Sequence, residues 1–188
     1  MITPLASNAA LILIDIQQGM DDPSLGKRNN LDAEANAARL LEAWRSSGRP
    51  LVHIQHRSVN PDSPLWSERP GVAIKPIVAP RDGEPHLTKS VNNAFVGTGL
   101  EVFLRERQIE QVVIAGLTTN HCVDTTTRMA GDLGFNPVLV SDASATFDRR
   151  GPDGVTWPAA TIHSVTMANL QDEFAEIATT DEVLERLG

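Results

Sequence analysis

The chain has 188 residues, of which 41% are hydrophobic and 21% charged, and its formal net charge is −8. This length and composition are typical of one globular domain, so we treat residues 1–188 as a single domain. The acidic balance, with both charge signs interleaved, argues against nucleic acid or an anionic membrane as a partner, because both require a concentrated basic surface.

The longest apolar run near the N-terminus is too short to span a bilayer, and no basic segment with a cleavable apolar stretch is present. We therefore expect a cytoplasmic protein. The single cysteine, Cys122, excludes an internal disulfide and a zinc cluster built from cysteines. It is either a small core residue or a reactive thiol.

The first half of the chain predicts alternating strands and helices. A short apolar run that ends in Asp15 indicates a buried strand, and Gly48 stops the helix that follows. The stretch up to Ser90 is rich in Pro, Gly and Asp, and a connection of this length is usually functional or carries short elements. The predicted elements are strands at 9–15 and 50–56, a long connection at 57–90 with a third strand at 86–90, and helices at 31–47 and 98–108.

The second half continues the alternation. The clearest strand ends in Gly116, and a short turn leads from it to a helix that Gly134 closes. Thr179 and Glu182 have the spacing of a capping box at the start of the last helix. The predicted elements are strands at 111–116, 136–142 and 177–179, helices at 120–133 and 161–174, and a loop around 151–154.

Strands that alternate with helices predict a mainly parallel sheet that is covered on both faces. Ligands of such folds bind beyond the carboxyl ends of the strands, where the strand order reverses. This rule selects the positions after Asp15, around Lys89 and after Gly116. We therefore expect the functional site where these three places meet.

Cys122 begins a predicted helix, for which Thr119 or Asn120 is the expected N-cap. The free N–H groups of a first helical turn favour a thiolate, which is the reactive form of cysteine. A buried structural cysteine is the more common case for a lone residue of this type. The position of Cys122 at a strand-to-helix junction brings the two interpretations into balance.

Asp15 and Lys89 are the candidate partners of this thiol. A charge at the end of an apolar strand is costly unless it is paired, although Asp15 could also be an N-cap or a surface acid. As a functional group it would accept the thiol proton and return it to a leaving amine. Lys89 is either an ordinary solvated lysine or the positive charge that keeps the sulfur ionised.

The histidines are weaker candidates. His121 adjoins Cys122, but neighbouring helical residues point about 100° apart, which makes His121 a poor base for that thiol. His53 and His56 face opposite sides of a predicted strand, so packing is a better interpretation for them than a metal site. The segment after Asp15 lacks the Gly-x-Gly-x-x-Gly pattern of a dinucleotide site.

Taken together, five segments resemble the isochorismatase-like cysteine hydrolase family. They are LIDIQ at 13–17, GEPHLTK at 83–89, NAFVGT at 93–98, GLTTNHCVD at 116–124 and RMAGDLG at 128–134. The resemblance implies a three-layer α/β/α fold with a six-stranded parallel sheet in the order 3-2-1-4-5-6. It places the first and fourth strands side by side.

The resemblance also implies a catalytic triad of Asp15, Lys89 and Cys122. It further implies a cis peptide between Leu117 and Thr118, with an oxyanion hole formed by the backbone N–H groups of Thr118 and Cys122. The implied reaction cleaves the C–N bond of a small amide or ureido compound through a thioester acyl-enzyme. The alternatives are a vinyl ether hydrolase of the isochorismatase type and a non-catalytic member of the fold.

Departures from the family pattern refine these expectations. The metal motif of nicotinamidase-like members has no acid here, where the sequence reads HIQHRS at 53–58, so we expect neither a metal nor another cofactor. Trp66 and Phe95 are candidate pocket residues, although packing is the more common role of each. The expected partners are a small-molecule substrate and other copies of the chain, as a dimer or tetramer.

Overall fold

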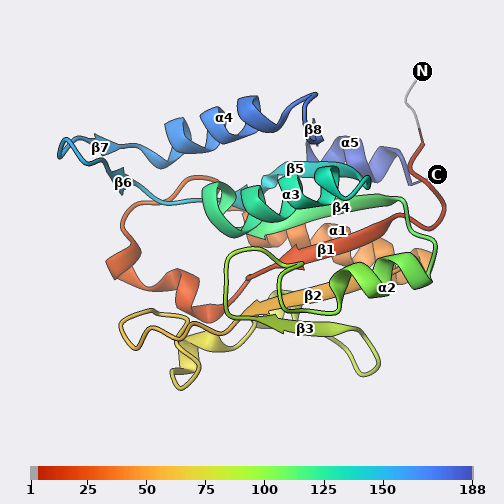
Figure 1. The fold of residues 1–188 in the computed structure, drawn as a ribbon, viewed down its shortest axis with the longest axis horizontal. Helices are drawn as coiled ribbons and strands as arrows, with labels where there is room; N and C mark the ends of the chain where they lie inside the picture. Colours follow the sequence, from red (N-terminus) through yellow and green to blue (C-terminus); the bar gives the residue numbers. More distant parts are fainter. Residues whose placement is uncertain (1–3, 188) are drawn as a thin grey trace.

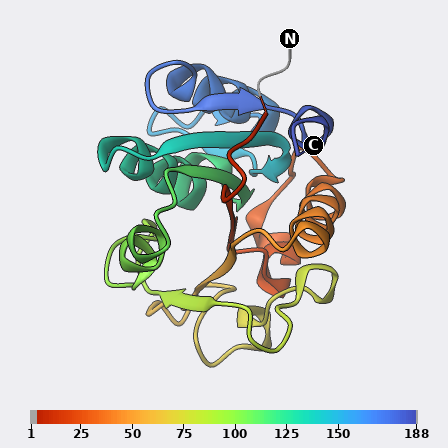
Figure 2. The ribbon, with the colours of Figure 1, turned by 90° about the vertical axis from the view of Figure 1, so that its right-hand side faces the viewer.

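The computed structural model describes residues 4–187, which form one parallel sheet between two layers of helices (Figures 1 and 2). The six strands follow the order β3-β2-β1-β4-β5-β8, and every neighbouring pair is parallel. This confirms the predicted fold and strand order, with β8 as the sixth strand of the sheet. The strands are β1 (Ala10–Ile14), β2 (Leu51–His56), β3 (His86–Lys89), β4 (Gln111–Leu117), β5 (Asn136–Ala145) and β8 (Glu176–Ala178).

Each face of the sheet carries its own hydrophobic core. Side chains alternate along β1, so Leu11 and Leu13 pack on one face and Ile12 and Ile14 on the other. No helix in the described part of the chain is long and apolar enough to span a membrane. One face is covered by α1 (Ala33–Ser47) and α5 (Thr180–Glu185), the other by α2 (Leu100–Glu106), α3 (Asp124–Asp132) and α4 (Ala159–Leu170) (Figure 2).

Several element bounds differ from those that the sequence predicts. The helix expected at 161–174 begins at Ala159 and ends at Leu170. Before it lies a small antiparallel hairpin of β6 (Arg149–Arg150) and β7 (Thr156–Trp157), where only a loop was expected (Figure 1). A strand of two residues is too short to show the alternation of apolar and polar residues by which strands are predicted, so this hairpin could not be predicted. The capping box of Thr179 and Glu182 is confirmed.

The connections after β1 and β2 pack together over the carboxyl ends of these strands. The buried side chain of Gln17 joins them: its Nε2 donates to the carbonyl oxygens of His56 (2.9 Å) and Val72 (2.7 Å), and its Oε1 accepts from the His56 N–H (2.9 Å). These connections contain four short 3₁₀ helices, η1 (Gln18–Asp21), η2 (Pro23–Leu25), η3 (Pro70–Val72) and η4 (Pro76–Val78).

Charged side chains from the same two connections bind a carboxylate of α1. Glu34, in the first turn of α1, accepts two hydrogen bonds from Arg28 (2.7 and 2.5 Å) and one from Lys75 (2.7 Å). Burial acts to raise the pKa of Glu34, but the hydrogen bonds and charges of Arg28 and Lys75 outweigh it and lower the pKa to about 2. The carboxylate therefore stabilises the folded state while it is ionised.

We expect Glu34→Gln to lower the free energy of unfolding by about 2–3 kcal/mol at pH 7, because it leaves two nearly buried cations with a neutral partner. The folded-state pKa lies below the ordinary 4.5, so this difference is complete above pH 4.5 and disappears as the pH falls towards 2. Urea unfolding as a function of pH measures it.

Glu42→Gln is the matched control, because Glu42 lies on the same helix but pairs with Arg81 at the surface, where both side chains are about 60% exposed. We expect this variant to unfold almost as the parent does. Equal losses of stability in the two variants would contradict the stabilising role of the Glu34 cluster.

Gly116 marks the place where the strand order reverses, between β1 and β4. Its φ of +136° is a conformation that favours glycine, and a Cβ atom there would lie 2.0 Å from the carbonyl oxygen of Ile14. The two strands therefore approach closely just before Asp15, which itself has a positive φ of 51°. Strained backbone of this kind is concentrated at functional sites.

Candidate active site

The three residues that the sequence selects meet at the carboxyl end of the sheet. Asp15 follows β1, Lys89 is the last residue of β3, and Cys122 lies in the turn after β4. The Lys89 Nζ donates to Asp15 Oδ2 at 2.6 Å, and both side chains are completely buried. The Cys122 sulfur lies within 4.8 Å of an Asp15 carboxylate oxygen, and Cys122 is only 7% exposed.

His56 is a further member of the site, although packing is the role that the sequence predicts for it. Its Nδ1 lies 3.1 Å from Lys89 Nζ. An ammonium group can only donate, so Nδ1 accepts and the ring proton is on Nε2. Burial, together with the positive charge of Lys89, lowers the pKa of His56 to about 4, so its ring is neutral near pH 7.

The hydrogen bonds of Lys89 hold its side chain in one place. Besides Asp15 and His56, its ammonium donates to the carbonyl oxygen of Val91 at 3.2 Å. An ammonium has three N–H donors, so these three partners account for all of them. Lys89 is therefore fixed beside the carboxylate of Asp15, from where its ammonium also acts on the Cys122 thiol and favours a lower pKa of that group.

The surroundings of Cys122 oppose the thiolate form that a helix start would favour. Burial first, and then the negative charge of Asp15, raise the pKa of the Cys122 thiol to about 12, although Lys89 acts in the opposite direction. The resting sulfur is consequently protonated at pH 7. Nucleophilic attack from this state requires a base that removes the thiol proton as the sulfur reacts.

Asp15 is placed to be that base. Burial raises its pKa above the ordinary value, against the opposing effect of Lys89. A carboxylate with a raised pKa is a stronger base than an ordinary aspartate, and its protonated form is a usable acid near neutral pH. The second carboxylate oxygen, Oδ1, is buried without a hydrogen-bond partner among the described residues.

The turn that carries Cys122 is a single π turn, η5 (Thr119–Val123), and α3 begins only after it. Neither Thr119 nor Asn120 acts as the expected N-cap; Thr118 precedes the turn, and no side chain caps it. Instead, Thr119 Oγ1 lies 2.9 Å from the buried His163 Nδ1, and Asn120 Oδ1 accepts from Thr146 Oγ1 at 2.5 Å. Side chains of α4 and of the segment after β5 therefore hold the turn in place. The peptide bond between Leu117 and Thr118 is cis.

A cavity of about 170 Å³ opens beside the sulfur, which suits a small molecule. Cys122, Thr118, His56 and Asn92 supply polar groups to its wall, and Asn92 Oδ1 lies 3.8 Å from the sulfur. The remaining lining residues are Gly19, Met20, Leu25, Ser63, Pro64, Leu65, His121, Thr146, Phe147 and Arg149.

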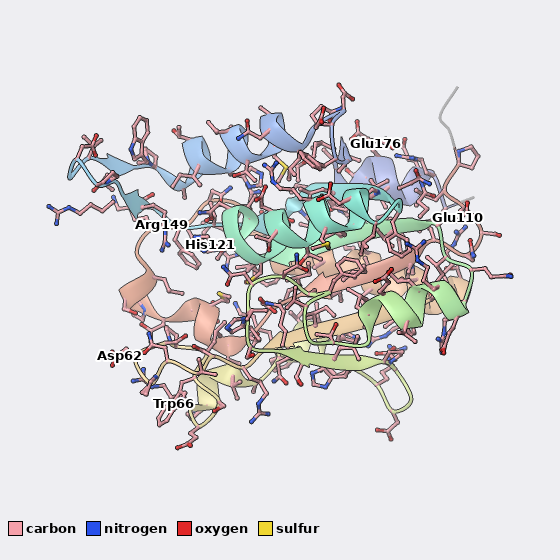
Figure 3. The ribbon with its side chains drawn as sticks, in the orientation of Figure 1. Asp62, Trp66, Glu110, His121, Arg149 and Glu176 are labelled. Atoms are coloured by element: carbon pink, nitrogen blue, oxygen red, sulfur yellow. The ribbon has the colours of Figure 1, made fainter. Side chains whose placement is uncertain are left out.

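The two pocket residues expected from the sequence, Trp66 and Phe95, do not line this cavity. Phe95 stacks on Phe135 at a centroid distance of 6.0 Å and belongs to the core under α2. Trp66 follows Leu65, which does line the cavity, and its ring lies on the outer loops, away from His121 (Figure 3). The prediction selected large rings, whereas this wall is formed mostly by smaller side chains.

A basic side chain from the unpredicted hairpin reaches the cavity. Arg149 of β6 lies beside His121 of η5, with 3.2 Å between Nη2 and Nε2 (Figure 3). A guanidinium can only donate, so His121 accepts at Nε2 and carries its proton on Nδ1, which is 3.3 Å from Thr118 Oγ1. Arg149 is therefore the one arginine or lysine among the residues that line the cavity.

Fold and site together define a doubly wound parallel α/β protein with a cysteine, an aspartate and a lysine at the switch point of its sheet. Residues 9–182 match the model of the isochorismatase domain, and the chain belongs to this family. It is 50% identical over 175 residues to the isochorismatase family protein YrdC of Bacillus subtilis, covering 93% of this chain and 94% of that protein. A solved structure of an isochorismatase-family protein from Chromobacterium violaceum superposes with a TM-score of 0.95 at 43% identity, over 100% of this chain and 99% of the other.

More distant relatives carry names that state an activity. The chain is 27% identical to an N-carbamoylsarcosine amidase of Arthrobacter, over 81% of this chain and 60% of that protein. It is 26% identical to the maleamate amidohydrolase of Pseudomonas putida, over 95% of this chain and 86% of that protein. Hydrolases that act on amides are therefore present among its relatives.

Proposed function

We propose that this protein is a cysteine hydrolase that cleaves the C–N bond of a small amide or ureido compound bearing a carboxylate. The observation that carries the proposal is the convergence of a buried carboxylate, a fixed ammonium and a thiol beside a small cavity. The names of the two amidase relatives support the bond type, because each refers to a compound that has both an amide or ureido group and a carboxylate.

The reaction begins with the protonated thiol of Cys122. Asp15 removes its proton as the sulfur attacks the carbonyl carbon of the substrate, while the Lys89 ammonium lowers the cost of the negative charge in the site. The backbone N–H groups of Thr118 and Cys122 stabilise the oxyanion that forms. Asp15 then protonates the departing nitrogen, which leaves a thioester on Cys122. A water molecule, deprotonated by Asp15, releases the acid and restores the thiol.

Ammonia release from a panel of small amides tests this proposal directly. We expect turnover of monoamides and ureido acids that carry a carboxylate, and a covalent acyl adduct on Cys122 when the reaction is quenched with acid and examined by mass spectrometry. Pyruvate release from isochorismate, with no adduct, would instead support the vinyl ether reaction. An inert protein across both assays would support a non-catalytic role.

Arg149 is the group that we expect to bind the carboxylate of the substrate, because it supplies a guanidinium to the cavity wall. A hydrogen bond to a charged group contributes about 1.5–3 kcal/mol, so Arg149→Gln should raise KM for anionic amides by roughly 10- to 100-fold. Turnover of a neutral amide should change little. Steady-state kinetics with an acidic amide and its methyl ester measure the difference.

Arg150→Gln is the matched control. Arg150 is the next residue of β6 and lies near Gly154 of the hairpin turn, outside the cavity wall. We expect its KM values to equal those of the parent. A similar KM increase in both variants would indicate a general electrostatic effect, and no increase in Arg149→Gln would contradict its role in carboxylate binding.

A further inference from the structure

The group around Lys89 has the donor set of a transition-metal site. A carboxylate oxygen of Asp15, a ring nitrogen of His56 and the sulfur of Cys122 all lie within 4.8 Å of one another. Thiolate, imidazole and carboxylate are the ligands with which proteins bind Zn²⁺, and three protein ligands leave a fourth position open. Magnesium and calcium, in contrast, select oxygen ligands alone.

Two acceptor atoms of this group, one on His56 and one on Asp15, are available to a cation. His56 Nδ1 is an acceptor because its partner is an ammonium, so its lone pair points towards Lys89 Nζ. Asp15 is completely buried, and its Oδ1 makes no hydrogen bond of normal geometry in the described part of the chain, although the Cys122 thiol lies close enough to favour a lower pKa of Asp15. A buried acceptor without a partner is unusual and indicates capacity for a cation or another donor.

The Lys89 ammonium occupies the position that a metal ion bound to these side chains would take. It lies 2.6 Å from Asp15 Oδ2 and 3.1 Å from His56 Nδ1, and so occupies the space between two of the three ligands. A zinc ion bound to a thiolate, a carboxylate and a neutral imidazole would have its charge balanced by those ligands. Adding a buried ammonium beside it would leave an excess positive charge, which is costly in a dry site.

We propose that Asp15, His56 and Cys122 form a latent binding site for Zn²⁺ that the Lys89 side chain blocks, and that zinc competes with this lysine and inactivates the site. Zinc binding forms the Zn–S bond and releases the thiol proton to solvent, with no change in oxidation state. Its affinity therefore rises with pH. Binding itself does not depend on the proposed hydrolase function, whereas inactivation does.

Isothermal titration calorimetry with Zn²⁺ on the wild type and on Lys89→Met tests the proposal without any substrate. We expect the affinity of Lys89→Met for zinc to exceed that of the wild type by about tenfold or more, because the competing ammonium is gone. Co²⁺ in the same variant should give a thiolate-to-metal charge-transfer band that is lost in Lys89→Met/Cys122→Ser. Mg²⁺ should produce neither signal.

The ligand role of His56 is tested in the same background. The zinc affinity of Lys89→Met/His56→Gln should be lower than that of Lys89→Met by about tenfold or more. Lys89→Met/His53→Gln is the matched control, because His53 lies on the same strand but is bonded to Glu84 at 3.1 Å, outside the group. Equal zinc affinity in the wild type and Lys89→Met, or equal losses in the two histidine variants, would overturn the proposal.

A measurement on the wild type covers the case in which Lys89→Met does not fold. Zinc should protect Cys122 from alkylation by iodoacetamide, with more protection at pH 8.5 than at pH 6.5, whereas Mg²⁺ should not. The protection should be weaker in His56→Gln, in which the glutamine oxygen can still accept from Lys89. Alkylation that is indifferent to zinc in both proteins would also overturn the proposal.

Discussion

Replacing Cys122 by alanine is expected to lower the rate of ammonia release by about 10⁴-fold or more, because no other group can form the thioester. The thiol occupies little volume, and the wall of the cavity beside it can relax, so the fold should remain intact. Ammonia assays and circular dichroism on the purified variant check both statements.

The result separates the two candidate reactions. A vinyl ether hydrolase needs the acid of Asp15 and not the sulfur, so release of pyruvate from isochorismate would continue in Cys122→Ala. Ammonia release at a rate close to that of the parent would contradict the cysteine mechanism. Loss of the circular dichroism signal would require the milder Cys122→Ser exchange for the same comparison.

Asp15→Asn is expected to have two large effects. It removes the base that takes the thiol proton, so ammonia release should fall by about 10³-fold or more. It also leaves the Lys89 ammonium buried beside a neutral amide. Breaking a buried ion pair in this way typically costs 3–5 kcal/mol, and we expect the free energy of unfolding to fall by about that amount. Urea unfolding measures the loss.

The double variant Asp15→Asn/Lys89→Met distinguishes these two effects. Removing both charges eliminates the unpaired ammonium, so stability should recover by about 2 kcal/mol or more relative to Asp15→Asn, whereas activity should not recover. A double variant that is as unstable as the sum of the single variants would indicate that the ion pair is not the source of the lost stability.

The alternation of strands and helices could be predicted from the sequence because β1, β2 and β4 are buried on both faces and appear as apolar runs, whereas the strand order came from the family resemblance. The runs that end in Asp15 and Gly116 became β1 and β4, adjacent and parallel as expected. Gly48 and Gly134, with φ of +66° and +82°, end their helices in the conformation that glycine favours. The β6–β7 hairpin was not predicted, because strands of two residues are too short to show an alternation of apolar and polar residues.

The site was predictable only in part. Position at the carboxyl ends of strands selected Asp15 and Lys89, and the same rule applied to β2 selects His56, which ends that strand. Arg149 could not be found this way, since it follows an extended β5 and reaches the cavity from the unpredicted hairpin.

The protonation state of the Cys122 sulfur could not be predicted from the sequence, for a different reason. A position near a helix start suggests a thiolate, but the burial of Cys122 and the charge of Asp15 outweigh that effect. Both are properties of the packed molecule. In the proposed reaction, deprotonation of the thiol therefore accompanies attack instead of preceding it.

Gly116, the last residue but one of β4, leaves the site little room for substitution. At residue 116 the backbone of one strand rests against the Ile14 carbonyl of its neighbour, with no room for even a methyl group. Asp15 is the next residue after that carbonyl. A single extra carbon at this point would wedge the two strands apart and pull the carboxylate away from the thiol. The absence of a side chain at residue 116 therefore keeps the Asp15 carboxylate close to the Cys122 sulfur.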